Sequence, residues 1–423
     1  MPWKAGKNKE RVKIMDILQR FSKYIQFETT SSEESEDTPS TACQLELAGY
    51  LKEELKAIGV PKVLLDEFGI VYGWLPATRG LEGEPALGFI SHMDTSPAAS
   101  GKNVKLNVIK DYDGNDVRLP SGVELLVRDF PHLKTLAGRT LLTTDGTTLL
   151  GADDKAGIAE IMTAVETVIR ENIPHGPLCI AFTPDEEVGR GADHFNVDLF
   201  GADFAYTIDG GPENELACET FNAASARIKI HGVSVHPGDA KDIMVNAALV
   251  ACELAAMLPA SETPRYTEGY EGFYHLDSIG GDVMEAHMNY IIRDHDRAVF
   301  EKRKAIIKEA VAAINSKYGA GTAVLALEDS YYNMKEIIDR HPHLMDNAKA
   351  VMEELGMTPD MIPVRGGTDG SRLSYMGLPC PNIGTGGYAF HGPMEHITVE
   401  GLEMASKVVL GLIKKYANRR SMK

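Results

Sequence analysis

Apolar residues recur at helical spacing close to the start of the chain, at Ile14, Ile17, Leu18 and Phe21. This period predicts an amphipathic helix over residues 10–26. A polar stretch follows it, and the next helical pattern stops before a glycine, a common helix terminator. The β-like apolar runs that come afterwards lie at 63–65, 70–75 and 86–92.

Further along, the pattern alternates between strands and helices. Residues 97–150 carry many turn signals and are expected to form a long, functional excursion. Beyond them the spacing predicts a helix over 154–171 and strands over 178–183 and 204–208. Strands that alternate with helices are typical of a doubly wound α/β layer.

The rhythm changes after Asn222. The elements predicted there are a strand at 226–230, a helix at 243–258, strands near 284–292, a charged helix at 298–317 and a strand at 323–327. A β-α-β-β-α-β order is that of a small ferredoxin-like α+β domain. The α/β pattern resumes from about Ile337. We therefore expect an inserted domain at 223–334 within a larger domain formed by 1–222 and 335–423.

Composition is that of an ordinary globular protein, because 43% of the 423 residues are apolar and 25% are charged. No run approaches the ~18–20 apolar residues of a membrane span. The basic N-terminus has no apolar stretch behind it, so no secretory signal is expected. Five scattered cysteines without a C-x-x-C pair favour a reduced, cytoplasmic chain. A net charge of −18 argues against nucleic acid, which needs a basic surface.

The candidate chemistry lies where apolar strands end, which is the edge that binds ligands in an open α/β sheet. His92 ends one such strand, and Asp94, two residues on, shares its face of an extended chain. Asp94 can then accept a ring N–H from His92 and fix its tautomer. A lone histidine at a strand end is more often structural, and the paired acid makes a metal site an equal alternative.

Two acidic patches extend the pattern. Asp153 and Asp154 open a helix, where acids serve as caps, but adjacent carboxylates repel unless a cation neutralises them. Cap and metal ligand both remain open for this pair. Asp185, Glu186 and Glu187 follow a buried-type strand, so their side chains must diverge, and one can bind a metal while its neighbour handles a water. A solvated, charged turn is the plainer interpretation.

Asp209 ends a further strand before two glycines, and His391 lies in a glycine-rich loop. Each alone is explained by a plain turn or loop. Together the five patches supply two histidines and several carboxylates, which suits two zinc ions that share one bridging carboxylate. Calcium prefers oxygen ligands over imidazole, and the sequence has no G-x-S-x-G or P-loop motif.

In this order the patches resemble the M20 family of metallopeptidases and, within it, the tripeptide aminopeptidases. The similarity extends from about Ile14 to Tyr416. The stretches that carry it are GFISHMDTSP, LLGADDKAGIAEIMTA, AFTPDEEVGRGA, EGYEGFYHL, YIIRD, EDSYYNM, RGGTDGSRLS, GLPCPN and TGGYAFHG. The resemblance implies a two-domain architecture, with a zinc-dependent exopeptidase-like catalytic domain and an inserted ferredoxin-like α+β lid domain.

The resemblance also implies a division of roles at the metal site. His92 and Asp209 would hold one zinc ion. Glu187 and His391 would hold the second, and Asp153 would bridge the two, so that each subunit binds two zinc ions. A cis peptide bond is expected directly after the bridging residue.

Catalytic roles follow from the same resemblance. Asp94 would be the acid behind His92. Glu186 would be the general base that takes a proton from the bridging water and passes it to the leaving amine. His236 would stabilise the tetrahedral oxyanion, either within its own chain or from a partner subunit.

Three residues of the insert and its flank would grip the carboxylate end of the peptide: Asn246, Arg293 and Arg365. An arginine fork matches a carboxylate, although a salt bridge is the plainer interpretation of either arginine. The predicted reaction is hydrolysis of tripeptides with release of the N-terminal residue, in an enzyme that binds no nucleic acid or membrane and for which a homodimer is left open. Another M20 activity (dipeptidase, carboxypeptidase or deacylase) would use the same metal residues. A non-catalytic metal-binding protein is the other alternative, and the intact Glu186 argues against it.

Overall fold

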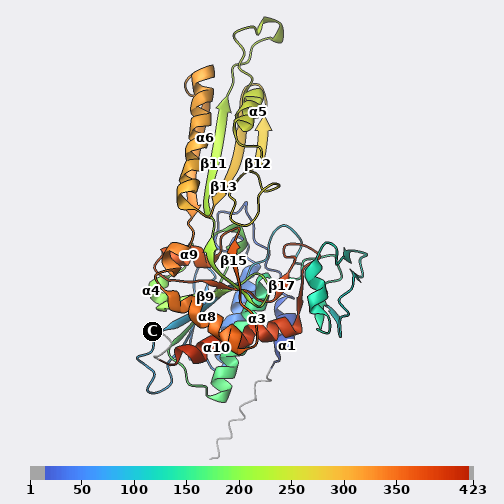
Figure 1. The fold of residues 1–423 in the computed structure, drawn as a ribbon, viewed down its shortest axis with the longest axis vertical. Coiled ribbons are helices and arrows are strands. Elements are labelled where there is room, and N and C mark those ends of the chain that lie inside the picture. Colours follow the sequence, from blue (N-terminus) through green and yellow to red (C-terminus); the bar gives the residue numbers. More distant parts are fainter. Residues whose placement is uncertain (1–14, 419–423) are drawn as a thin grey trace, which may run out of the picture. The chain divides into compact units, whose positions relative to one another are not determined.

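The computed structural model describes residues 15–418 (Figure 1). The described chain divides into two compact units. The first contains the chain up to Leu216, Arg340–Met361, and the chain from Met376 onward. The second contains Ala217–Asp339 and Ile362–Tyr375. These limits lie a few residues from the expected domain limits, and the short segment before Met376 groups with the inserted unit.

The central sheet has eight strands. They are β1 (Lys62–Leu65), β2 (Val71–Leu75), β3 (Leu87–His92), β8 (Leu178–Thr183), β9 (Phe204–Ile208), β10 (Glu215–Thr220), β15 (Asp360–Val364) and β16 (Asn382–Ile383). Their order is β1-β2-β8-β3-β9-β16-β10-β15. β8, β3, β9 and β16 run parallel to one another, while β2 pairs antiparallel with both β1 and β8. β3 and β8 are buried along their whole length, as continuous apolar runs in a parallel sheet should be.

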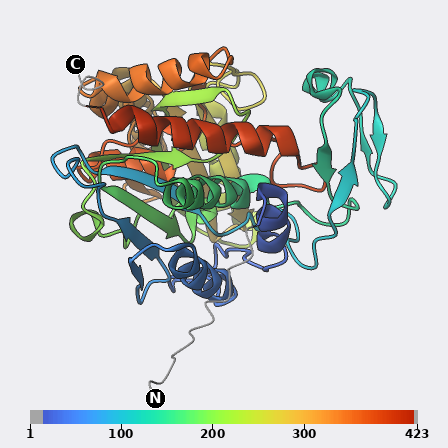
Figure 2. The same cartoon turned by 90° about the horizontal axis from the view of Figure 1, so that it is seen from below.

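The helices of the first unit are α1 (Ile17–Tyr24), α2 (Gln44–Ile58), α3 (Ala152–Glu171), α4 (Val197–Phe200), α8 (Pro342–Glu354) and α10 (Val399–Tyr416). α3 packs against α10 and β3, and α3 and α10 run side by side in Figure 2. α1 begins later than expected because Asp16 forms a capping box with Gln19. Residues 10–14 of the predicted helix lie outside the described residues.

The excursion at 97–150 has structure of its own. It contains β4 (Asn107–Ile109), β5 (Val117–Arg118), β6 (Glu124–Leu125), the 3₁₀ helix η1 (Pro131–Leu136) and β7 (Leu141–Thr143). β4 and β7 join β17 (Gly387–Tyr388) and β18 (His396–Thr398) in a four-stranded sheet with the order β17-β18-β7-β4. Leu125, Leu133 and Leu136 belong to its separate small core. This sheet attaches the C-terminal glycine-rich loop to the excursion.

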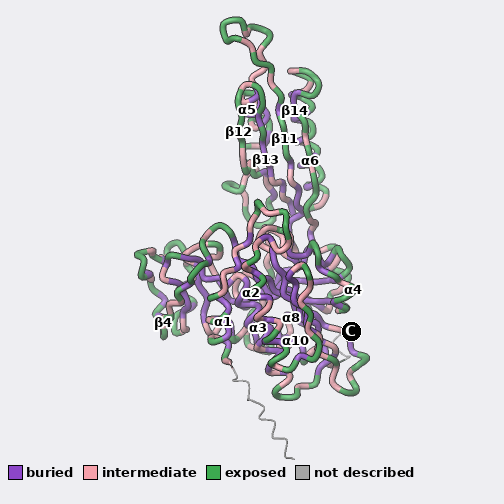
Figure 3. Tube along the Cα trace, turned by 180° about the vertical axis from the view of Figure 1, so that it is seen from behind, coloured by how far each residue is buried: buried purple, intermediate pink, exposed green. Residues whose placement is uncertain are grey.

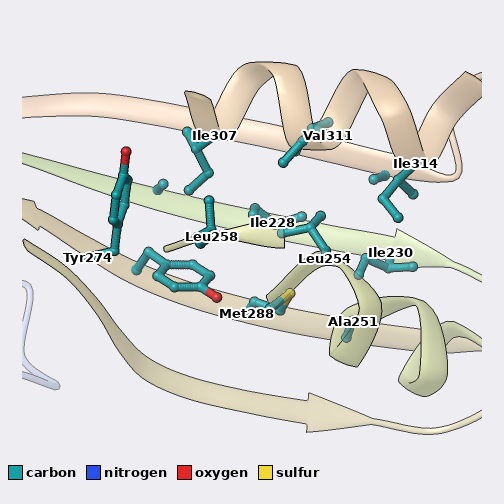
Figure 4. Close-up of a cluster of buried hydrophobic side chains, with 14 of the residues drawn as sticks. Ile228, Ile230, Ala251, Leu254, Leu258, Tyr274, Met288, Ile307, Val311 and Ile314 are labelled. Atoms are coloured by element: carbon teal, nitrogen blue, oxygen red, sulfur yellow. The ribbon is translucent and has the colours of Figure 1, made fainter. Parts of the chain in front are cut away.

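The second unit confirms the predicted β-α-β-β-α-β order. Its elements are β11 (Asn222–His231), α5 (Ala247–Met257), β12 (Phe273–Gly281), β13 (Glu285–Asp294), α6 (Arg297–Tyr318) and β14 (Ala323–Tyr331), followed by the short helices α7 (Lys335–Ile338) and α9 (Asp369–Tyr375). The sheet is antiparallel in the order β12-β13-β11-β14. Ile307 and Ile314 of α6 point toward the inward residues of β11, as Figure 4 shows.

Burial follows these elements. In Figure 3 the buried residues gather in the central sheet and its helices, and along the inward positions of the strands of the second unit. β11 alternates buried and exposed positions over its second half, as a strand with one covered face does. None of the helices within residues 15–418 is both long and apolar enough to cross a membrane.

Candidate metal centre

Three neighbouring parallel strands deliver the predicted residues to one edge of the sheet. His92 is the last residue of β3, which pairs with β8 on one side and β9 on the other. Asp209 follows β9 directly, and the acidic turn Asp185–Glu187 follows β8. Because the three strands are parallel, their carboxyl ends meet at this edge.

The Asp153 carboxylate lies between two imidazoles. Its Oδ1 is 2.9 Å from Nε2 of His92, and its Oδ2 is 3.3 Å from Nε2 of His391. Each imidazole also meets a second carboxylate. His92 Nε2 is 3.6 Å from Asp209 Oδ1, and His391 Nε2 is 2.9 Å from Glu187 Oε2. The five residues expected at the metal site are therefore all brought together, in a chain with Asp153 at its centre.

Burial makes this gathering of charge costly. The side chains of His92 and Glu187 are only 2% and 5% exposed. Burial raises the pKa of Glu187 to about 6, and it also raises the pKa of Asp209. Hydrogen bonds with Asp153 and Glu187 raise the pKa of His391 to about 10. Burial opposes a proton on His92, but the carboxylates around it, Asp209 first, outweigh burial and raise its pKa. The cluster thus attracts positive charge.

The donor set fits a metal cofactor. Two groups of ligand atoms lie within 4.8 Å of one another, His92 with Asp153 and Glu187, and His92 with Asp154 and Asp209. Within the described residues, Glu187 Oε1 and Asp154 Oδ1 are buried atoms with no hydrogen-bond partner. Imidazole nitrogens and carboxylate oxygens are suitable ligands for zinc and similar ions. A cation would supply the partner that these buried oxygens lack.

The turn at the start of α3 separates the two adjacent aspartates. The peptide bond Asp153–Asp154 is cis, which confirms the expectation from the family resemblance. Both residues have non-helical φ and ψ, and regular helix begins after them. Asp153 meets the two histidines, whereas Asp154 Oδ2 accepts the backbone N–H of His92 at 3.1 Å. Asp154 therefore belongs to the cluster, and the sequence had left its role open.

Asp94 holds the acidic turn in place. Its carboxylate accepts the backbone N–H of Glu186 at 3.0 Å and that of Glu187 at 3.2 Å. Nδ1 of His92 lies 3.1 Å from the Asp94 carbonyl oxygen and 3.4 Å from its carboxylate Oδ1. The backbone carbonyl oxygen of Asp94 is thus the nearer acceptor for the His92 ring. The Asp94 carboxylate mainly accepts the backbone N–H groups of the acidic turn that follows β8.

The three consecutive acids of that turn point to different partners. Asp185 has a left-handed φ of 60°. Its carboxylate accepts hydrogen bonds from the Ser40 backbone N–H and from Gln44 Nε2, both at 2.7 Å. Glu187 meets His391, and Glu186 is partly exposed between them. Because the three side chains diverge, Glu187 joins the metal cluster and Glu186 lies beside it.

His236, the residue predicted to stabilise the oxyanion, belongs to the second unit. Unlike the buried metal cluster, it is exposed to solvent. The His236 side chain is 80% exposed. Its Nδ1 accepts the backbone N–H of Gly238 at 3.1 Å. In the neutral ring the proton therefore sits on Nε2, where it can be donated to an oxygen.

The predicted carboxylate grip is also in the second unit. Asn246 caps α5 by accepting the N–H of Leu249 at 3.2 Å, which leaves its NH₂ group as a donor. Arg293 lies 5.3 Å from the ring centre of Tyr331. Arg365 directs four of its five N–H donors at oxygens of Thr267, Gly269 and Glu271. The Arg365 guanidinium group thus already holds the segment from Thr267 to Glu271 in place.

Comparison with known proteins identifies relatives over nearly the whole chain. Residues 218–322 match the family model described as the peptidase dimerisation domain. Peptidase T of Alkaliphilus oremlandii is 52% identical over 408 residues, which cover 96% of this chain and 100% of the relative. Peptidase T of Caldanaerobacter subterraneus is also 52% identical, over 406 residues that cover 95% and 99% of the two chains.

Solved structures agree with these relatives. The crystal structure of aminopeptidase PepT from Bacillus cereus matches with a TM-score of 0.76 and 25% identity, covering 95% of this chain and 98% of that one. A tripeptidase from Staphylococcus aureus has the same fold, with a TM-score of 0.75, 24% identity and the same coverage. Identity of 52% across nearly all of both sequences shows that the chain belongs to the peptidase T family of M20 metallopeptidases.

Proposed function

We propose that this protein is a zinc-dependent aminopeptidase that releases the N-terminal residue from tripeptides. The observation that carries the proposal is the Asp153 carboxylate between two imidazoles, each beside a further carboxylate, in a chain half identical to peptidase T. A shared carboxylate between two histidine-containing sets is the arrangement a two-zinc centre needs.

We assign the ligands accordingly. His92 and Asp209 would hold one zinc ion, and Glu187 and His391 the other. Asp153 would bridge them, because its two oxygens face different imidazoles. When bound, the two ions would lower the pKa of a water molecule and polarise the scissile carbonyl group.

Glu186 is the proposed general base. Asp94 fixes the backbone N–H groups of Glu186 and its neighbour Glu187, so the two side chains leave a turn whose position is set from behind. Glu186 would take a proton from the attacking water as its oxygen bonds to the carbonyl carbon. It would return that proton to the leaving nitrogen as the C–N bond breaks. Asp94 would act by orientation and would not exchange protons with the substrate.

We assign His236 to the oxyanion, because the hydrogen bond to its Nδ1 leaves the Nε2–H as the donor. Asn246 and Arg293 would grip the carboxylate end of the peptide with their remaining donors. Arg365 would share in that grip mainly by holding the segment that contains Thr267.

A cavity of about 590 Å³ opens beside the cluster, in the size range of small-molecule sites. Glu187 and His391 line it on one side, and the exposed acids Glu33 and Glu34 line it elsewhere. Its negative lining suits the free ammonium group of a peptide better than an acylated amine.

The protein is further proposed to be a cytoplasmic homodimer. The match to a peptidase dimerisation domain supports dimerisation through the second unit. On that unit α5 exposes Leu249 at 67%, and Ile243 and Met284 nearby in the same unit are each 55% exposed. Exposed apolar residues of this kind favour a protein partner. Sedimentation of the purified protein would test the dimer.

The test of the activity is a substrate panel on zinc-loaded enzyme. It compares a tripeptide with the matching dipeptide and tetrapeptide, and with the N-acetylated tripeptide. We expect the free tripeptide to be cleaved fastest and its first residue to be released. Equal rates on the acetylated tripeptide would refute an aminopeptidase, and preference for the dipeptide would favour a dipeptidase.

A further inference from the structure

Glu395 is a buried acid for which the proposed reaction has no role. Glu395 is only 1% exposed. It lies between the end of the glycine-rich loop and β18, four positions beyond the histidine His391. Burial of a carboxylate costs free energy unless hydrogen bonds compensate for it. The partners of Glu395 therefore indicate what it does.

All the hydrogen bonds described for this carboxylate come from the turn that carries the bridging aspartate. Oε2 accepts the backbone N–H of Leu150 at 2.7 Å and that of Gly151 at 2.9 Å. Oε1 accepts the backbone N–H of Asp153 at 3.1 Å. Gly151, at the N-cap position of α3, supplies no side-chain cap of its own. Glu395 thus caps the start of α3 from a distant part of the sequence.

The same loop carries His391 to the other side of Asp153. Its two ends are joined, because β17 and β18 pair through Gly387 with Ile397 and Tyr388 with His396. Within the closed loop, His391 has a φ of 62° and its Nε2 lies 3.3 Å from Asp153 Oδ2. The loop therefore grips Asp153 twice, once at its side chain and once at its backbone.

We propose that Glu395 is the positioning residue that aligns the two halves of the metal centre. It fixes the backbone of Asp153 relative to the loop that carries His391, so that the bridging oxygen and the imidazole keep a constant separation. This inference rests on the proposed metal centre, but not on the identity of the substrate. Glu395 would hold the backbone beside Asp153 and His391 in place, just as Asp94 holds the backbone of the acidic turn.

The role requires a carboxylate and not merely a polar group. Three N–H donors converge on two oxygens, and both oxygens are used. A glutamine keeps one oxygen and replaces the other with an NH₂ donor. In either orientation its NH₂ would face at least one backbone N–H. Glu395→Gln should therefore release the turn while keeping the shape of the side chain.

The experiment titrates metal-free protein with Co²⁺, follows the visible absorption spectrum, and measures affinity by competition with a chelator. We compare the natural protein with E395Q, with E395D, and with E400Q as the matched control. Glu400 also accepts one backbone N–H, from Thr140 at 2.8 Å, but it is not hydrogen-bonded to the turn that carries Asp153. We expect E395Q to bind Co²⁺ about 10–100-fold more weakly and with an altered spectrum. E395D, which keeps the charge, should recover part of the affinity, and E400Q should match the natural protein.

Natural Co²⁺ affinity and spectrum in E395Q would overturn the proposal. So would equal losses in E395Q and E400Q. If E395Q does not fold, E395D decides, because a purely structural role would lower its metal-free melting temperature and leave its Co²⁺ affinity and spectrum unchanged. If the natural protein binds Co²⁺ but does not cleave tripeptides, only the proposed activity fails.

Discussion

The metal cluster of the first unit and His236 of the second unit are built in opposite ways. At the cluster, His92 is almost fully buried and Asp153 is fixed at both its side chain and its backbone. In the second unit, His236 is 80% exposed, and the hydrogen bond described for its ring comes from its own turn. Fold contacts alone determine the first arrangement. The His236 side chain is instead left open to solvent.

The two units also differ in how much repulsion between charged groups they contain. The cluster gathers carboxylates and imidazoles where water is scarce, so the fold accepts local repulsion that a cation can relieve. The second unit has an ordinary apolar core between β11 and α6, and among the described residues both metal-type groups belong to the first unit. The two units should therefore respond differently to the loss of metal.

Metal removal should have the largest effect. Chelation should abolish hydrolysis and destabilise the first unit, by about 4 kcal/mol if the free metal had been at 1,000 times its Kd. Hydrogen exchange resolved by peptide would localise the change. Peptides from the start of α3 should exchange faster, while those from β11 and β13 should not change. If chelation accelerated hydrogen exchange equally in both units, the proposed difference in their dependence on metal would be wrong.

The second largest effect should come from Glu186→Gln. Loss of the base should lower kcat by about 10²–10⁴-fold, with KM and bound metal unchanged. Glu187→Gln is the matched control, since it makes the same exchange of an oxygen for an NH₂ group at the adjacent residue. It should lose metal, because Glu187 Oε2 is the atom that meets His391. A Glu186→Gln enzyme with natural kcat would refute the proposed base.

Much of the framework was predictable from local patterns. His92 and Asp209 each end an apolar run, so their strand-end positions follow from the sequence. The order of elements in the second unit was also predicted. The strands of the excursion were not, because elements of two or three residues such as β5 and β7 leave no periodicity. The first of the two strands between α5 and α6, β12, lies earlier than the predicted strands near 284–292, because Ser278, Gly280 and Gly281 interrupt its apolar pattern.

The site was less predictable than the fold. Spacing alone made Glu186 one of three acids in a charged turn, and the family resemblance divided their roles. The contact of Glu395 with Leu150 joins residues 245 positions apart, and no local pattern reveals it. Its only signal was an acid between a glycine-rich loop and a short buried strand. Long-range hydrogen bonds of this kind have to be seen in the structure.

His236 should give the third effect. His236→Ala should lower kcat by about 10²–10³-fold, since an oxyanion donor is lost, and should leave metal content unchanged. His231→Ala, at the exposed end of β11, is the control and should be silent. Mixing subunits of His236→Ala and Glu186→Gln tests the dimer, because recovered activity would mean that His236 acts across the interface. Natural kcat in His236→Ala would remove it from the mechanism.

The smallest effect should come from the acidic wall of the cavity. Glu33 and Glu34 are exposed, so their attraction for a substrate ammonium is screened and amounts to about 0.2–1 kcal/mol. The double variant Glu33→Gln/Glu34→Gln should raise KM for a free tripeptide by up to about 5-fold, with little change in kcat, and added salt should shrink the difference. Glu36→Gln/Asp37→Asn removes the same charge from the same loop, from residues that do not line the cavity. If both double variants raise KM equally, the effect is one of overall charge, and the exposed groups near the cluster contribute no selectivity for a free amine.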